Sequence, residues 1–368
     1  MPSRALHGAR RTIPSWMSVR PRRAGQRTDG IPLFVEEMTK AVLEAGGELE
    51  AMQTAAAVPL PAHPVPASLQ ASLMARLDRL GPAKELAQIG AAIGREFSHV
   101  LLAAVVRKPE AELASSLDRL IRAGLLFRKG VPPHATYLFK HALVQDAAYG
   151  TLLRVRRHAL HERIAKYLEQ QYPELVETQP ELLAHHLTEA GLAEPAIDSW
   201  YKAGERALRR SANAEAVKHL TRGIELTQSM PTSAKCIGKE LDLHLALGPA
   251  FLATKGNGAP ETLRVYLRAR DLLGEGGTHT QRMRVNWGLW NIHYRRAELK
   301  AALGVAEEYL VRATRQGYGE ARANRLMGQS LCVMGALANA RRHLQRTVDL
   351  CIANRDDSTE SLILSETK

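Results

Sequence analysis

The chain has 368 residues, of which 45% are hydrophobic, 24% charged and 5% aromatic, and its formal net charge is +12 at pH 7. It is long enough for more than one folded domain, and no apolar run reaches the length of a membrane span. Few aromatic residues beside many Ala, Leu, Arg and Glu residues favour helices over sheets, so we expect a mainly all-α protein. The cysteines, Cys236, Cys332 and Cys351, follow no disulfide or metal-ligand spacing, which is typical of a cytoplasmic protein.

The excess positive charge is concentrated at the N-terminus. Residues 1–28 contain no Asp or Glu, and removing their seven arginines from the total leaves 12 − 7 = +5 for the rest of the chain. The segment has no helical or strand period, and three interpretations stay open: a disordered basic arm, a start-site artefact on a truncated gene, or a targeting signal. The seven residues are Arg4, Arg10, Arg11, Arg20, Arg22, Arg23 and Arg27.

Residues 29–66 predict one helix followed by a linker. A turn at Asp29-Gly30 places Pro32 in the first helical turn, and Gly46-Gly47 ends the helix. The Pro- and Ala-rich stretch from Ala55 to Pro66 reads as an extended linker.

Residues 67–172 predict a module of helices with one hairpin. Leucines at helical spacing end at Gly81-Pro82, and three further helices are expected up to Gly124. Two short apolar runs flank Lys129-Gly130 and Pro132-Pro133, as in a β-hairpin. The next expected helix begins just after His141. Helices, a hairpin and another helix favour a winged-helix-like fold.

Residues 173–355 show a weak repeat. Trp200, Gly204, Ala216 and Leu220 have the spacing of a tetratricopeptide repeat, and Gly328, Ala340 and Leu344 repeat it. Small residues are expected where the two helices of a repeat cross closely. Two more helix pairs are expected over Leu241–Gly274 and Arg282–Gly317, so the region predicts an α-solenoid, with residues 356–368 as a tail.

Three segments carry a resemblance to a known family. They are DGIPLFVEE at 29–37, ARLDRLGPAKELAQIGAAIGREF at 75–97 and FKHALVQDAAY at 139–149. With the repeats, they resemble bacterial STAND/AAA-type predicted ATPases that end in tetratricopeptide repeats and are often fused to class III adenylate/guanylate cyclase or transcription-factor domains. The resemblance implies that Pro32 lies against an adenine and that His141 senses nucleotide phosphates.

The sequence departs from that family at the nucleotide site. It contains no GxxxxGK[ST] phosphate loop and no Walker-B strand, and Ala142 replaces the Asp that follows the sensing His in the family pattern. We therefore expect the C-terminal portion of such a regulator, without catalysis and without a cofactor. ATP or ADP would bind only if an N-terminal ATPase domain were supplied.

Two clusters of polar residues suggest other sites. Arginines after the hairpin form a candidate basic contact patch, for which DNA binding is weighed against a solvated or interdomain face. His158 and His161 could share a metal but have no third ligand in view, and His185 and His186 adjoin on one helix and point to different sides, so we expect no metal site. The patch consists of Arg154, Arg156, Arg157 and Arg163.

The sequence thus predicts a non-catalytic helical signalling scaffold that contacts a protein or peptide through its repeats. No membrane partner is expected, and nucleic acid is expected only as nonspecific binding by the basic arm. Two alternatives stay open: the lid and regulatory arm of an ATPase or cyclase, and a DNA-binding transcriptional regulator.

Overall fold

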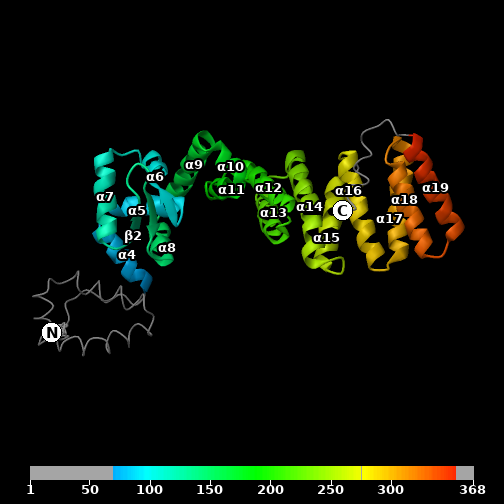
Figure 1. The fold of residues 1–368 in the computed structure, drawn as a ribbon, viewed down its shortest axis with the longest axis horizontal. Coiled ribbons are helices and arrows are strands. Elements are labelled where there is room, and N and C mark those ends of the chain that lie inside the picture. Colours follow the sequence, from blue (N-terminus) through cyan, green and yellow to red (C-terminus); the bar gives the residue numbers. More distant parts are fainter. Residues whose placement is uncertain (1–68, 275, 354–368) are drawn as a thin grey trace, which may run out of the picture. The chain divides into compact units, whose positions relative to one another are not determined.

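The computed structural model describes residues 69–274 and 276–353, and within them the chain is mainly helical with one small antiparallel sheet (Figure 1). Pro32, the basic arm, the linker and the tail lie outside the described residues. The chain divides into two compact units, Met1–Tyr167 and Leu168–Lys368. The expected mainly helical class with a small hairpin is confirmed.

The first unit alternates helices with three short strands. Leucines at helical spacing explain its first helix, because Leu73 and Leu77 are buried while Met74 and Ala75 between them are exposed. Its elements are α4 (Leu69–Arg79), α5 (Pro82–Ile93), β1 (Glu96–Ser98), α6 (His99–Val106), α7 (Glu110–Arg122), β2 (Leu126–Lys129), β3 (Thr136–Phe139), α8 (Ala142–Gly150) and the larger part of α9 (Arg154–Gln171).

The sheet of this unit has the strand order β1-β3-β2, with both pairs antiparallel. Strand β1 was not expected from the sequence: three residues carry too little pattern, and Ser98 both ends the strand and caps α6 by accepting the backbone N–H of Leu101. Phe97 pairs with Tyr137 and stacks on its ring at 5.7 Å between centroids. The Phe97 ring also covers Gly90 of α5, where a Cβ would meet the ring.

The second unit is built from helices packed against their neighbours in chain order (Figure 1). The expected pairs over 241–274 and 282–317 are present, and both begin earlier than expected, at Ala234 and at His279. The helices are α10 (Pro173–Thr178), α11 (Pro180–Glu189), α12 (Ala193–Arg209), α13 (Asn213–Thr227), α14 (Ala234–Lys255), α15 (Pro260–Leu273), α16 (His279–Arg295), α17 (Leu299–Gln316), α18 (Glu320–Val333) and α19 (Leu337–Ala353).

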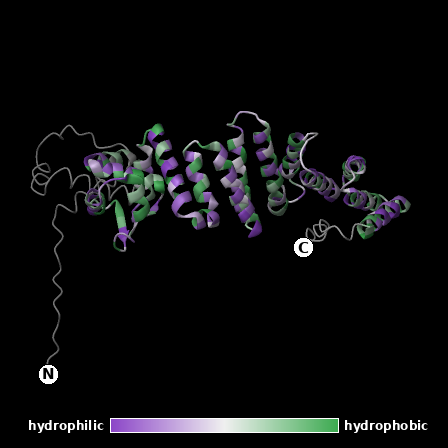
Figure 2. Cartoon of the chain, turned by 90° about the horizontal axis from the view of Figure 1, so that it is seen from above, coloured by the Kyte–Doolittle hydropathy of each residue, from purple (hydrophilic) through white to green (hydrophobic). Residues whose placement is uncertain are grey.

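Glycines let these helices approach closely. A Cβ built on Gly248 would lie 2.4 Å from Cζ of Tyr266, and one on Gly288 would lie 2.0 Å from Cε1 of the same ring. Tyr266 therefore lies between α14 and α16, and its ring is buried. Apolar and polar residues alternate around the helices of this unit (Figure 2). None of the described helices combines the length and apolar character needed to cross a bilayer.

Candidate interaction site on the last helix pair

His141, expected to sense phosphates, lies at the N-terminal cap of α8. Its backbone is extended, and its carbonyl accepts the N–H of Val144 at 3.1 Å. Its side chain is half-buried. Its expected companion Pro32 lies outside the described residues, so the structure does not bring the two together.

The four arginines of the expected basic patch make different contacts inside the first unit. Arg163 donates to the carbonyl of Val105 at 2.6 Å, near the end of α6. Arg156 forms an ion pair with Glu85, which Lys108 also binds at 2.8 Å. The remaining two residues differ in exposure: Arg157 lies over the Tyr149 ring, with Cζ 4.2 Å from the centroid, whereas Arg154 is exposed.

The helix before the hairpin has an acidic exposed face. In DNA-binding folds of this order, the helix preceding the wing is the one that enters the major groove. Here that helix is α7, whose exposed charges are Glu110, Glu112, Asp118, Arg119 and Arg122. Three carboxylates against two guanidinium groups would repel phosphates more than attract them. This surface argues against the DNA-binding alternative.

The histidines considered as metal ligands have protein neighbours. Nε2 of the buried His161 lies 2.9 Å from the Tyr149 hydroxyl, and His158 is half-buried on the same helix. On α11, His186 is buried and His185 exposed, and their ring centroids are 5.3 Å apart.

The residues expected to pack the repeats lie between paired helices. Gly204 on α12 faces Leu220 on α13, and the buried Ala216 lies one turn before that leucine. Trp200 donates from Nε1 to the Thr188 hydroxyl at 3.0 Å and stacks on the His219 ring.

The same arrangement closes the last described helix pair, α18 and α19. A Cβ built on Gly328 would lie 2.6 Å from Cγ of Leu344, and Ala340 is buried beside it. One face of α19 is therefore pressed against α18.

The side of α19 next to this contact is apolar and exposed. Leu337, Val348 and Ile352 lie at helical spacing, with 64%, 49% and 59% of their surfaces exposed. Among the described residues of the second unit, eight large hydrophobic side chains are exposed, and five of these lie between Val333 and Ile352. Capping repeats normally carry a polar outer face, so this concentration of exposed apolar side chains is unusual.

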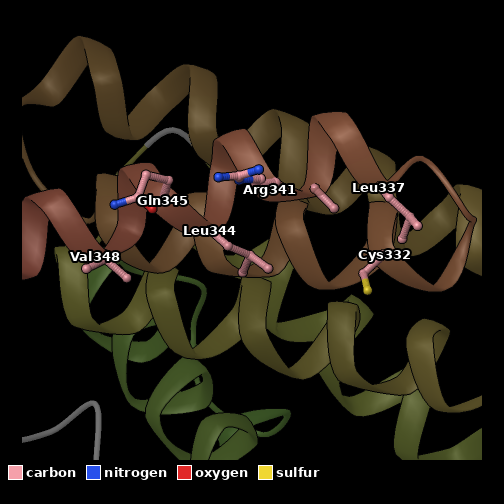
Figure 3. A pocket seen from close by; sticks show the side chains of 7 residues that line it. Cys332, Leu337, Arg341, Leu344, Gln345 and Val348 are labelled. Carbon is pink, nitrogen blue, oxygen red and sulfur yellow. The ribbon is translucent and has the colours of Figure 1, made fainter.

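An open hollow of about 350 Å³ runs along this face. Figure 3 shows side chains from Leu337 to Val348 following one another along α19, with the Cys332 sulfur of α18 at one end. The lining consists of Cys332, Leu337, Ala340, Arg341, Leu344, Gln345 and Val348, and we call it the α19 groove.

The groove lies on a basic helix. Helix α19 carries Arg341, Arg342 and Arg346 against the single Asp349. Arg346 is held by Glu320 at 3.1 Å, and Asp349 accepts a hydrogen bond from Gln345 at 2.9 Å. Arg341 is exposed and lines the groove. The groove therefore suits an occupant with both apolar and acidic side chains.

The sequence itself carries a signal for this groove. Leucine, valine and isoleucine at 337, 344, 348 and 352 form a second stripe beside the buried one at Ala340. The two together make an apolar stripe that is wider than the contact with α18 covers.

Comparison with known proteins gives limited support for a family. No family model matches the chain. An uncharacterised protein of Rhizobium meliloti (strain 1021) is 29% identical over 289 residues, which cover 76% of this chain and 28% of that relative. The chain thus matches less than a third of the relative's length.

One solved structure that resembles the chain is a Signal Transduction ATPase with Numerous Domains (STAND) protein with a tetratricopeptide repeat sensor, from Pyrococcus horikoshii. The TM-score is 0.39 at 11% identity, and the match covers 92% of this chain and 58% of the other. Nothing about function follows from a match at this level.

Proposed function

We propose that the chain is a non-catalytic helical signalling scaffold whose repeat unit binds a protein or peptide in the α19 groove. The observation that carries the proposal is the exposed apolar stripe of Leu337, Val348 and Ile352 at the end of the described array. A preformed groove with apolar side chains and a flanking guanidinium is the arrangement that binds an amphipathic segment. The partner is expected to present two or three apolar side chains and at least one carboxylate.

In this proposal the first unit serves as a regulatory module. The hydrogen bonds and ion pairs of Arg156 and Arg163 stabilise that unit internally. The wider resemblance to STAND regulators would make the natural partner another domain of the same signalling assembly.

A peptide-library selection on the full chain tests the proposal. Selected peptides should combine apolar and acidic residues, and their dissociation constants can be measured by fluorescence anisotropy. Val348→Asp places a charge in the groove and should weaken binding about tenfold or more, since burying an unpaired carboxylate costs over 1 kcal/mol.

Val311→Asp is the matched control for this selection. Val311 is also an exposed valine, on α17 and outside the groove. The Val311→Asp variant should therefore bind the selected peptides with unchanged affinity. Peptides that bind both variants equally well, or a selection that yields no binder, would contradict the proposal.

A further inference from the structure

We propose that residues 356–366 of this chain occupy the α19 groove and compete there with the partner. The inference rests on the proposed function only in that both concern the same groove. Three observations support it: the reach of the segment, its composition, and the charge of α19.

The segment is long enough to reach the groove. Leu344 lies nine residues before Ala353, the last residue of α19, which corresponds to about 14 Å along a helix. Leu362 lies nine residues after Ala353, and nine extended residues span up to about 30 Å. The chain can therefore turn back and place Leu362 beside Leu344 and Val348.

The composition of the segment matches the groove. Its sequence, DDSTESLILSE, holds the apolar run Leu362-Ile363-Leu364 between acidic residues on both sides, with no Lys or Arg. The apolar run suits the stripe of Leu337 and Val348. The carboxylates suit a helix that carries three arginines and one aspartate.

Charge also favours this occupant over a second copy of α19. Two copies that met through the same face would bring their arginines together, and like charges brought close oppose association. An acidic segment of the same chain meets no such repulsion, and its local concentration is high because it is tethered.

Cys332 provides a direct test, since it is exposed and lines the groove. Replacing Cys351 by Ser leaves Cys332 and the buried Cys236, so alkylation by a maleimide reports on the groove. In this background, Leu362→Asp with Leu364→Asp should release the segment. If the segment covers the groove about nine-tenths of the time, alkylation of Cys332 should become about tenfold faster.

Ser361→Asp with Ser365→Asp is the matched control. It adds the same two charges to the segment but keeps the apolar run, so Cys332 should be alkylated no faster than in the parent protein. Equal rates in the parent and the Leu→Asp variant would overturn the inference. So would protection that grows with protein concentration and persists in that variant, because a second copy would then cover the groove.

The two proposals fail separately. In the variant with Leu362→Asp and Leu364→Asp, the affinity for the selected peptide should rise by the same factor as the alkylation rate of Cys332. If alkylation rates are equal while Val348→Asp still loses the peptide, only the inference about the segment is wrong. If Cys332 is shielded while Val348→Asp keeps the peptide, only the proposed function is wrong.

Discussion

The side chain of Leu220 lies directly on the backbone of Gly204, so that a Cβ at that glycine would be 2.4 Å from Cδ2 of the leucine. Leu344 lies on Gly328 in the same way, in the last described helix pair. In both pairs the leucine follows the glycine by sixteen residues, with a buried alanine between them. The spacing in the sequence thus corresponds to one recurrent contact between paired helices.

Gly204→Ala should destabilise the repeat unit. Alanine has the higher helix propensity by about 1 kcal/mol, but the contact with Leu220 forces repacking that costs about 1–3 kcal/mol. Gly304→Ala on α17 is the matched control, because a Cβ there meets no atom within 4 Å, and it should stabilise the protein. Urea denaturation measures both; a Gly204→Ala variant as stable as Gly304→Ala would disprove the contact.

Arg296→Met should loosen the loop between α14 and α15. Nε of Arg296 donates to the carbonyl of Asn257 at 2.8 Å, and Nη2 donates to those of Gly258 and Ala259. Losing these bonds should cost about 1–2 kcal/mol and speed trypsin cleavage after Lys255. The neighbouring Arg295 is exposed, so trypsin should cleave the Arg295→Met variant at the same rate as the parent protein. Equal cleavage in the two variants would show that Arg296 does not hold the loop.

Acidification should weaken the repeat unit through His244. Burial lowers the pKa of this imidazole below its ordinary 6.5, and Nδ1 is a buried nitrogen without a hydrogen-bond partner in the described structure. Glu240 would favour the charged form, but Arg268 already holds that carboxylate at 2.8 Å. As pH falls through 6.5, the unfolded chain takes up a proton that the folded chain does not, so the free energy of unfolding decreases.

His244→Leu should therefore flatten the fall in stability between about pH 7.5 and 5.5, a window set by histidine titration. Ser199→Ala replaces another buried polar side chain that does not titrate, and it should shift stability equally at every pH. Denaturation curves across this range give both slopes. A His244→Leu slope as steep as the parent's would contradict the prediction.

Removing residues 1–27 should abolish retention on heparin or duplex DNA. Their seven arginines have no acidic neighbours, and arginine-rich segments bind phosphates by counterion release, without sequence preference. The shortened protein should keep its helical circular dichroism and melting temperature. If it still distinguished one duplex sequence from another at physiological salt, a DNA site within the folded units would replace this interpretation.

The chain should neither bind nor hydrolyse ATP measurably. Triphosphate affinity depends largely on a phosphate loop and Mg²⁺, and the sequence has no such loop. His141 could offer one hydrogen bond, which is too little for micromolar affinity. Calorimetry with Mg²⁺ and ATP tests this; micromolar binding that disappears in His141→Ala would favour the regulatory arm of an ATPase.

The sequence predicted the helices well and the contacts between them less well. The spacing of leucines is a strong signal for a helix, because the leucines on one side of each helix are buried. Examples are Leu73, Leu77, Leu113 and Leu117. The hairpin was visible because turn residues separate two short apolar runs. Strand β1 was missed because its pairing with β3 depends on residues about forty positions away, and only Phe97 is apolar within it.

The candidate site was harder to predict for a physical reason. The apolar face of α19 is exceptional only because no described helix covers it, and no local pattern records what lies beside a helix. The same holds for Arg296, whose carbonyl partners lie nearly forty residues earlier. Conversely, the sequence suggested a contact patch for the arginines of α9. Their partners within the same unit, such as the carbonyl of Val105, are distant in the sequence and cannot be read from the local pattern.

The sheet has a consequence for the order in which the chain folds during synthesis. Strand β1 pairs with β3 and not with β2, the next strand in the chain. Residues 96–98 therefore cannot pair until residues 136–138 have left the ribosome. Each helix pair of the second unit, by contrast, can close as soon as its own residues emerge. The first unit is therefore exposed to aggregation and proteases for longer than any single repeat, although it is made first.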